Sequence, residues 1–152
     1  MRQSTRYAGI WSVFAGGMVG TTLRYLIGQT VGRNSGPSFF ALDTFIVNIV
    51  GAFALALIVG FITGSGTLTR AKLRFRLFFG TGLLGGFTTY STFALQTAGA
   101  LRDNNWVLVA AYGVGTLTAG LLASLVGLLI GRVWSRNVGE LPLRGHQRKE
   151  GE

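Results

Sequence analysis

Four long apolar stretches constrain this chain more than any other feature of its sequence. They run approximately through residues 10–31, 39–63, 77–101 and 106–133. Each is long enough to cross the hydrocarbon core of a bilayer as a helix. Lipid offers no partner to backbone polar groups, so a span is either a helix or part of a closed barrel, and apolar runs without strict alternation favour helices. The pattern predicts an all-α membrane protein with four transmembrane helices.

The length of the chain and its charge content support a single membrane domain. At 152 residues it is too short for two sizeable domains, and its charged share of 12% is about half that of a soluble domain. We expect a four-helix transmembrane unit over residues 1–134 and a basic, flexible C-terminal tail over 135–152. The first stretch also resembles a signal peptide, but its apolar run is too long and has no clear cleavage site, so we expect it to be retained. Without cysteine, the chain has no disulfide framework and no thiolate metal site.

The basic residues are distributed unequally between the two sides of the predicted bundle. With four spans, both termini and the loop at 64–76 share one side, which carries eleven of the fourteen Lys and Arg residues; the others are Arg24, Arg33 and Arg102. The positive-inside tendency then places both termini in the cytoplasm of a multi-pass plasma-membrane protein. Basic residues that flank spans suit anionic lipid headgroups, and we expect no binding of nucleic acid despite the net charge of +9.

The inventory of reactive side chains excludes several functions. The spans contain no serine–histidine–acid set and no pair of carboxylates, and no glycine-rich phosphate loop follows a strand, so we expect no enzyme. A proton-coupled transporter, including a small multidrug antiporter, usually needs a titratable group at depth, and no span has one near its centre. His146 has no nearby metal-ligand partner. Asp43 begins the second span, where we expect it to serve as a helix cap or dipole partner.

The polar residues that remain at depth are neutral. Asn48 lies in the second span on one helical face with Thr44 and Gly51. It either holds two helices together or donates its NH2 group to a passing anion. In the fourth span Tyr112 and Thr116 are spaced by four residues, and they either serve packing or line a polar track. The glycines that follow them favour close helix packing.

The segment GLLGGFTTYSTF, residues 82–93, should weaken the third helix. Each glycine disfavours a helix interior by about 1 kcal/mol relative to alanine, and the hydroxyl residues compete with the backbone ladder. A break would free carbonyls that can hold a hard cation such as Na+, and N–H groups that favour anions. An intact helix whose hydroxyls bond back along the backbone is equally compatible with the segment.

Three motifs together resemble those of the Fluc (CrcB) family of bacterial fluoride-specific ion channels. They are GGMVGTTLRY at 16–25, DTFIVNIVGAF at 43–53, and GLLGGFTTYSTF at 82–93, in the family's order and spacing. The third is the most specific. The resemblance covers approximately residues 10–132 and leaves the tail outside. Two positions depart from the family pattern, which often has Phe where Tyr90 stands and usually has Gly where Asp43 stands.

The resemblance implies a channel subunit that works as an antiparallel dimer, with a break in the third helix. From the glycine cluster beside the hydroxyl residues we expect this break around residues 85–88. Carbonyls of Gly85 and Thr88 from two subunits would hold a structural Na+ at the dimer centre, and Arg24 would belong to a structural motif. The fluoride path would use neutral donors and aromatic edges, namely Asn48, Tyr90, Ser91, Thr92, Phe93, Tyr112 and Thr116. The implied function is passive fluoride export that lowers cytoplasmic fluoride. The alternative is a non-conducting structural membrane subunit, in which these polar residues only pack helices.

The charge bias adds an expectation about assembly. An antiparallel homodimer needs a chain that inserts in both orientations, and therefore nearly balanced loop charges. Inverting this chain would move Arg70, Lys72, Arg74 and Arg76 across the membrane against the positive-inside tendency. We therefore expect an antiparallel heterodimer with a paralogous subunit of opposite bias, although a homodimer is possible.

Overall fold

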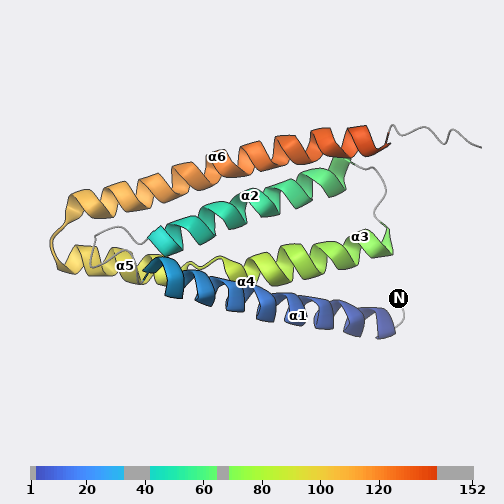
Figure 1. Ribbon diagram of the computed structural model, residues 1–152, viewed down its shortest axis with the longest axis horizontal. Helices are drawn as coiled ribbons and strands as arrows, with labels where there is room; N and C mark the ends of the chain where they lie inside the picture. Colours follow the sequence, from blue (N-terminus) through green and yellow to red (C-terminus); the bar gives the residue numbers. More distant parts are fainter. Residues whose placement is uncertain (1–2, 33–41, 65–68, 140–152) are drawn as a thin grey trace, which may run out of the picture.

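The computed structural model describes residues 3–32, 42–64 and 69–139, and all regular structure among them is helical. The chain runs through three long segments and one interrupted segment (Figure 1). The first segment is α1 (Gln3–Ile27) followed by the π-helical turn η1 (Gly28–Gly32), and the second is α2 (Leu42–Gly64). The interrupted segment, which we term the third path, consists of α3 (Arg70–Phe75), the π-helical η2 (Arg76–Leu84), α4 (Gly85–Phe87) and α5 (Ser91–Arg102). The last segment is α6 (Trp106–Gly139).

The four segments lie alongside one another as an elongated bundle. The start of α1, the start of α3 and the end of α6 are at one end, and the α5–α6 corner is at the other (Figure 1). Within the described residues, two helical segments are long and apolar enough to span a membrane, Leu42–Gly64 and Trp106–Asn137. Of the other two predicted spans, α1 is a continuous helix of 25 residues and the third path is interrupted. The predicted four-helix architecture is therefore present, with two clear spans among the described residues.

Glycines bring the segments into backbone contact along two lines, which we term the glycine seams. In the first, between α1 and the third path, a Cβ on Gly20 would collide with the carbonyl oxygen of Leu83. In the second, between α2 and α6, a Cβ on Gly131 would collide with the carbonyl oxygen of Leu57. Other glycines without room for a Cβ are Gly16, Gly82 and Gly86 in the first seam and Gly60 and Gly127 in the second. The predicted packing role of the fourth-span glycines is confirmed at Gly127 and Gly131.

The burial pattern is that of a membrane chain rather than a soluble bundle. The buried core is small, with Val47, Leu84 and Phe87 at its centre. Large apolar side chains such as Trp11, Leu121 and others along α1 and α6 are exposed. In water such a surface would be unstable, whereas in lipid it faces hydrocarbon.

The corner between α5 and α6 is fixed by asparagines. Asn104 has a φ of 54°, a left-handed conformation that asparagine tolerates better than most residues. The Asn105 side chain then accepts a hydrogen bond of 3.0 Å from the Leu108 N–H and caps α6. This corner turns the chain back so that α6 packs on α2.

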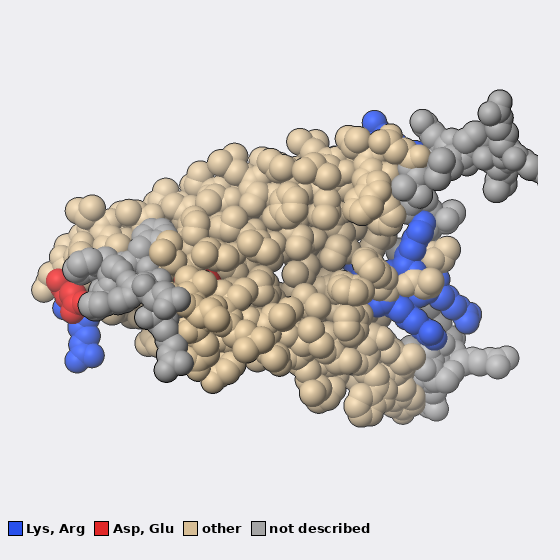
Figure 2. All heavy atoms as spheres, in the orientation of Figure 1, with Lys and Arg blue, Asp and Glu red and all other residues tan. Residues whose placement is uncertain are grey.

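The basic side chains gather at the end of the bundle that holds α3 (Figure 2). Those in the third path are Arg70, Lys72, Arg74 and Arg76, and those near the end of α6 are Arg132 and Arg136. At residues 135–139, which we had expected to begin the flexible tail, α6 continues without interruption. The rest of the tail with His146, and the predicted basic residue Arg33, lie outside the described residues.

Candidate functional site

The third path leaves the helix at Thr88 and resumes it at Ser91. Thr88 is extended, with φ −76° and ψ 156°, while Gly85 is helical with φ −65° and ψ −34°. The break therefore lies at 88–90, slightly after the segment 85–88 where the glycines place it by propensity alone. The reason is that Gly82 and Gly86 serve the first seam, where they approach the carbonyl oxygens of Val13 and Gly17. Contact with α1 holds the glycines helical.

Asn48 supplies the hydrogen bonds that the broken helix loses. Its Oδ1 accepts from the Thr89 N–H at 2.8 Å, and its Nδ2 donates to the Thr89 carbonyl at 3.0 Å. The partners fix the orientation of the amide, since a backbone N–H only donates and a carbonyl only accepts. Thr89 is buried, so without Asn48 both of its backbone groups would be unpaired away from water. Asn48 thus joins α2 to the break, one of the two roles that the sequence left open.

Hydroxyls close the other side of the break. Thr89 Oγ1 lies 3.2 Å from Ser91 Oγ and 3.1 Å from Thr92 Oγ1, and it accepts from the Thr92 N–H at 3.3 Å. The last bond satisfies an N–H in the first turn of α5 that has no helical partner. The three hydroxyls form one cluster at the N-terminus of α5.

The break also releases carbonyl oxygens. In a continuous helix the Thr89 N–H would donate to the Gly85 carbonyl and the Thr92 N–H to the Thr88 carbonyl. Here those two N–H groups donate to Asn48 and to the Thr89 hydroxyl instead. Gly85 is exposed, and nothing lies within 4 Å of the position that its Cβ would occupy. The Thr88 hydroxyl meanwhile donates to the Leu84 carbonyl at 3.0 Å.

Aromatic residues of α5 and α6 meet beside the break. The rings of Phe93 and Tyr112 are 5.1 Å apart between centroids, at 32°. Tyr112 is buried, and its hydroxyl donates to Gln96 Oε1 at 2.8 Å. Tyr90 is 81% exposed, with its ring 6.2 Å from that of Phe93. Thr116, one turn after Tyr112, is buried, and its hydroxyl has no hydrogen-bond partner in the described part of the chain.

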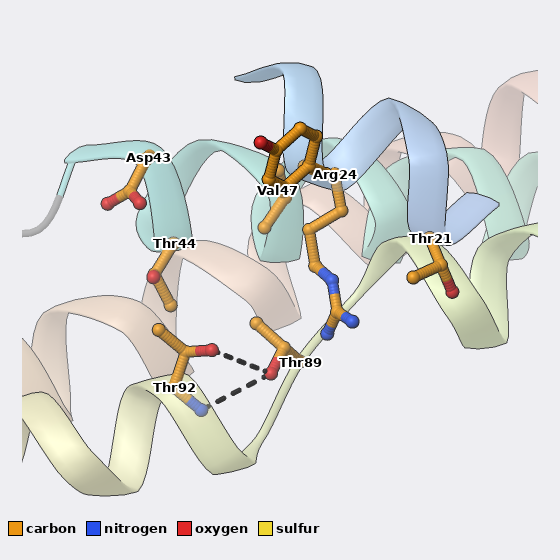
Figure 3. A pocket seen from close by; sticks show the side chains of 8 residues that line it. Thr21, Arg24, Asp43, Thr44, Val47, Thr89 and Thr92 are labelled. Atoms are coloured by element: carbon orange, nitrogen blue, oxygen red, sulfur yellow. Dashed lines mark hydrogen bonds between the residues drawn. The ribbon is translucent and has the colours of Figure 1, made fainter. Parts of the chain in front are cut away.

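A pocket of about 300 Å³ opens beside this group, between α1, α2 and the break. Arg24 projects into it from α1, toward Thr89 (Figure 3). The pocket is lined by Thr21, Arg24, Tyr25, Asp43, Thr44, Val47, Thr89 and Thr92. One guanidinium and several hydroxyls in this lining can donate to an anion, while the Asp43 carboxylate opposes its entry. The sequence placed Arg24 only in a structural motif, and the structure places it in this pocket.

Sequence reasoning missed Gln96 as a member of the site. A signal for it exists, because Gln96 follows Thr92 by four residues and Phe93 by three, and so shares a helix face with both. Its partner Tyr112 is sixteen residues away on another helix. That distance in sequence is what hid the pair.

Comparison with known proteins identifies relatives over most of the chain. Residues 11–128 match the family described as "CrcB-like protein, Camphor Resistance (CrcB)". A protein of Chloroflexus aurantiacus named "Fluoride-specific ion channel FluC" is 36% identical over 123 residues, which cover 81% of this chain and 94% of that protein. A protein of Agrobacterium fabrum with the same name is 38% identical over 120 residues, 79% of this chain and 93% of that protein. A third, from Prosthecochloris aestuarii, is 32% identical over 130 residues, with 86% and 98% covered.

Proposed function

The chain belongs to the CrcB family, and on that basis we propose that it is a subunit of a fluoride-specific ion channel. Its task is passive export that lowers cytoplasmic fluoride. The observation that carries the proposal is the break in the third path. Asn48 and the hydroxyl cluster satisfy it with neutral hydrogen-bonding groups, and no carboxylate takes part in those bonds.

Neutral donors suit the conduction of a small, strongly hydrated anion. A narrow path must replace the waters of fluoride, yet it must bind weakly enough to release the ion. Ser91 and Thr92 offer hydroxyl donors at the start of α5, and the unpaired Thr116 hydroxyl offers another on α6. Ring edges are electropositive, so Phe93 and Tyr90 can face the ion without a formal charge.

Asn48 and Tyr112 line this path and also hold neighbouring residues of the path in place. Asn48 uses its oxygen and one N–H on Thr89, which leaves its second N–H for an anion. Tyr112 donates to Gln96 and stacks on Phe93, so its hydroxyl fixes the ring beside the path. The proposed path is therefore lined by residues from three helices, α2, α5 and α6.

The carbonyls of Gly85 and Thr88 fit the proposed structural Na+. They are hard oxygen donors outside the helical ladder, and the open space at Gly85 admits the approach of a second subunit. Bound there, the cation would supply fixed positive charge and would join two chains. Two carbonyls are too few for a complete coordination shell, which is why we place the site at a dimer centre.

The charge distribution supports one orientation, with both termini in the cytoplasm. The basic end of the bundle carries the Lys and Arg residues of the third path and of the end of α6 (Figure 2). Arg102 is the last residue of α5, and the α5–α6 corner lies at the opposite end (Figure 1). We therefore propose an antiparallel heterodimer with a paralogous subunit. C-terminal reporter fusions test it: only a cytoplasmic reporter should be active. Strong activity of a periplasmic reporter as well would indicate dual insertion and favour a homodimer.

Fluoride efflux from proteoliposomes tests conduction directly, with chloride as the control ion. Because of the proposed assembly, the chain is reconstituted alone and with its paralogue. Phe93→Ile roughly keeps the packing volume and removes the ring edge, so it should reduce fluoride flux. A well-folded, fully assembled dimer that passes no fluoride would support the structural-subunit alternative. Unchanged flux in Phe93→Ile would remove that ring from the mechanism.

A further inference from the structure

The pocket beside the break is lined by two side chains of opposite charge, which have opposite effects on an anion. Among the described residues that line it, Arg24 and Asp43 are the charged ones. They come from α1 and α2, and Figure 3 shows them apart, with no hydrogen bond drawn between them. A guanidinium draws anions into the pocket, and a carboxylate repels them.

Asp43 is placed so that its charge reaches both the pocket and the proposed path. It lies in the first turn of α2, next to Thr44, and its Oδ2 is 3.8 Å from the position of a Cβ on Gly28. Its carboxylate also interacts electrostatically with Tyr112. Thr44, the next residue of α2, is buried, and its side chain is a hydrogen-bond partner of Tyr112. A single carboxylate therefore lines the pocket and also interacts with Tyr112.

We propose that Asp43 limits how much fluoride the pocket holds, by opposing the attraction of Arg24, and so limits flux through the subunit. This rests on the proposed channel function. The expectation from sequence was that Asp43 serves as a helix cap or dipole partner. The two roles differ in a measurable way, because a cap acts on stability, whereas a charge beside the path acts on flux and is screened by salt.

Asp43→Asn removes the charge and keeps the size and capping ability of the side chain. We expect fluoride efflux to rise roughly threefold at about 10 mM ionic strength, where the Debye length is about 30 Å, and the gain to disappear near 1 M salt. Asp43→Glu keeps the charge and should not reproduce the gain. The matched control is Asp103→Asn at the α5–α6 corner, which removes an acid outside the pocket and should not change flux.

Arg24→Gln completes the test, since it should lower efflux at low salt and reduce the gain produced by Asp43→Asn. Equal efflux of wild type and Asp43→Asn at low salt would overturn the inference and leave the channel function standing. A gain that persists unchanged at 1 M salt, or one shared by Asp43→Glu, would also overturn it. If the assembled wild type passes no fluoride, the channel function fails first, and the inference with it.

Discussion

Replacing Asn48 by alanine should remove the two hydrogen bonds that hold the break. The Thr89 N–H and carbonyl, now bonded at 2.8 and 3.0 Å, would lose their partners in a buried position. An unsatisfied buried group costs about 1–3 kcal/mol, so the loss for two groups with partial access to water is about 2–3 kcal/mol. Because 1.4 kcal/mol is a factor of ten, hydrogen exchange of the Thr89 amide should accelerate about 30- to 150-fold if it exchanges by local opening.

The measurements are hydrogen exchange and thermal unfolding of the purified chain in detergent. Asn105→Ala is the matched control, because that asparagine makes one capping bond to the Leu108 N–H, far from the break, and should cost about 1 kcal/mol. Asn48→Asp should cost at least as much as Asn48→Ala, since its carboxylate accepts from the Thr89 N–H but sets a second, charged oxygen against the Thr89 carbonyl. If Asn48→Ala exchanges at Thr89 as slowly as wild type, the break is held by other contacts and the reasoning is wrong.

Three further outcomes follow from the structure. Gly20→Ala should destabilise the chain by about 1–3 kcal/mol in thermal unfolding, because its Cβ meets the backbone of η2. Gly115→Ala, where a Cβ has open space, should be neutral or stabilise by up to about 1 kcal/mol. Equal effects of the two substitutions would contradict the close backbone contact that we describe in the first seam. Tyr112→Phe should cost about 1 kcal/mol by leaving Gln96 without its donor, and should lower fluoride flux, while Tyr7→Phe on the exposed face of α1 should change neither. Na+ at one hundred times its Kd should stabilise the assembled dimer by about 2.7 kcal/mol relative to K+, and equal unfolding temperatures in the two salts would contradict the cation site.

The sequence predicts the helical segments well because apolar runs directly report what lipid requires. It also predicts that the third helix is weak near 82–93. It misplaces the break slightly, because propensity treats every glycine as a weak point. Gly82 and Gly86 instead permit contact with α1, so the helix persists through them. Only the tertiary contact decides which weak residue gives way.

The sequence predicts which residues belong to the site, but it does not predict the hydrogen bonds and contacts between them. Asn48 and the hydroxyls of Ser91 and Thr92 stand out as polar groups at depth. That Asn48 bonds to Thr89 depends on a contact across 41 residues, which no local spacing contains. The entrance of Arg24 into the pocket depends in the same way on how α1 packs on η2 and α4. The proposed dimer and the proposed cation would involve a second chain, and the fold of one chain does not determine them.

The glycine seams have a consequence for how such a chain tolerates mutation. Backbone contacts backbone along each seam, so correct pairing of the helices depends on a few positions that have no side chain. The leucines and valines on the outer faces need only be apolar, since hydrocarbon accepts any of them. A library that exchanges outer positions such as Leu121, Leu129 and Val133 freely among apolar residues should yield mostly folded protein. The same freedom at Gly16, Gly20, Gly127 or Gly131 should yield almost none.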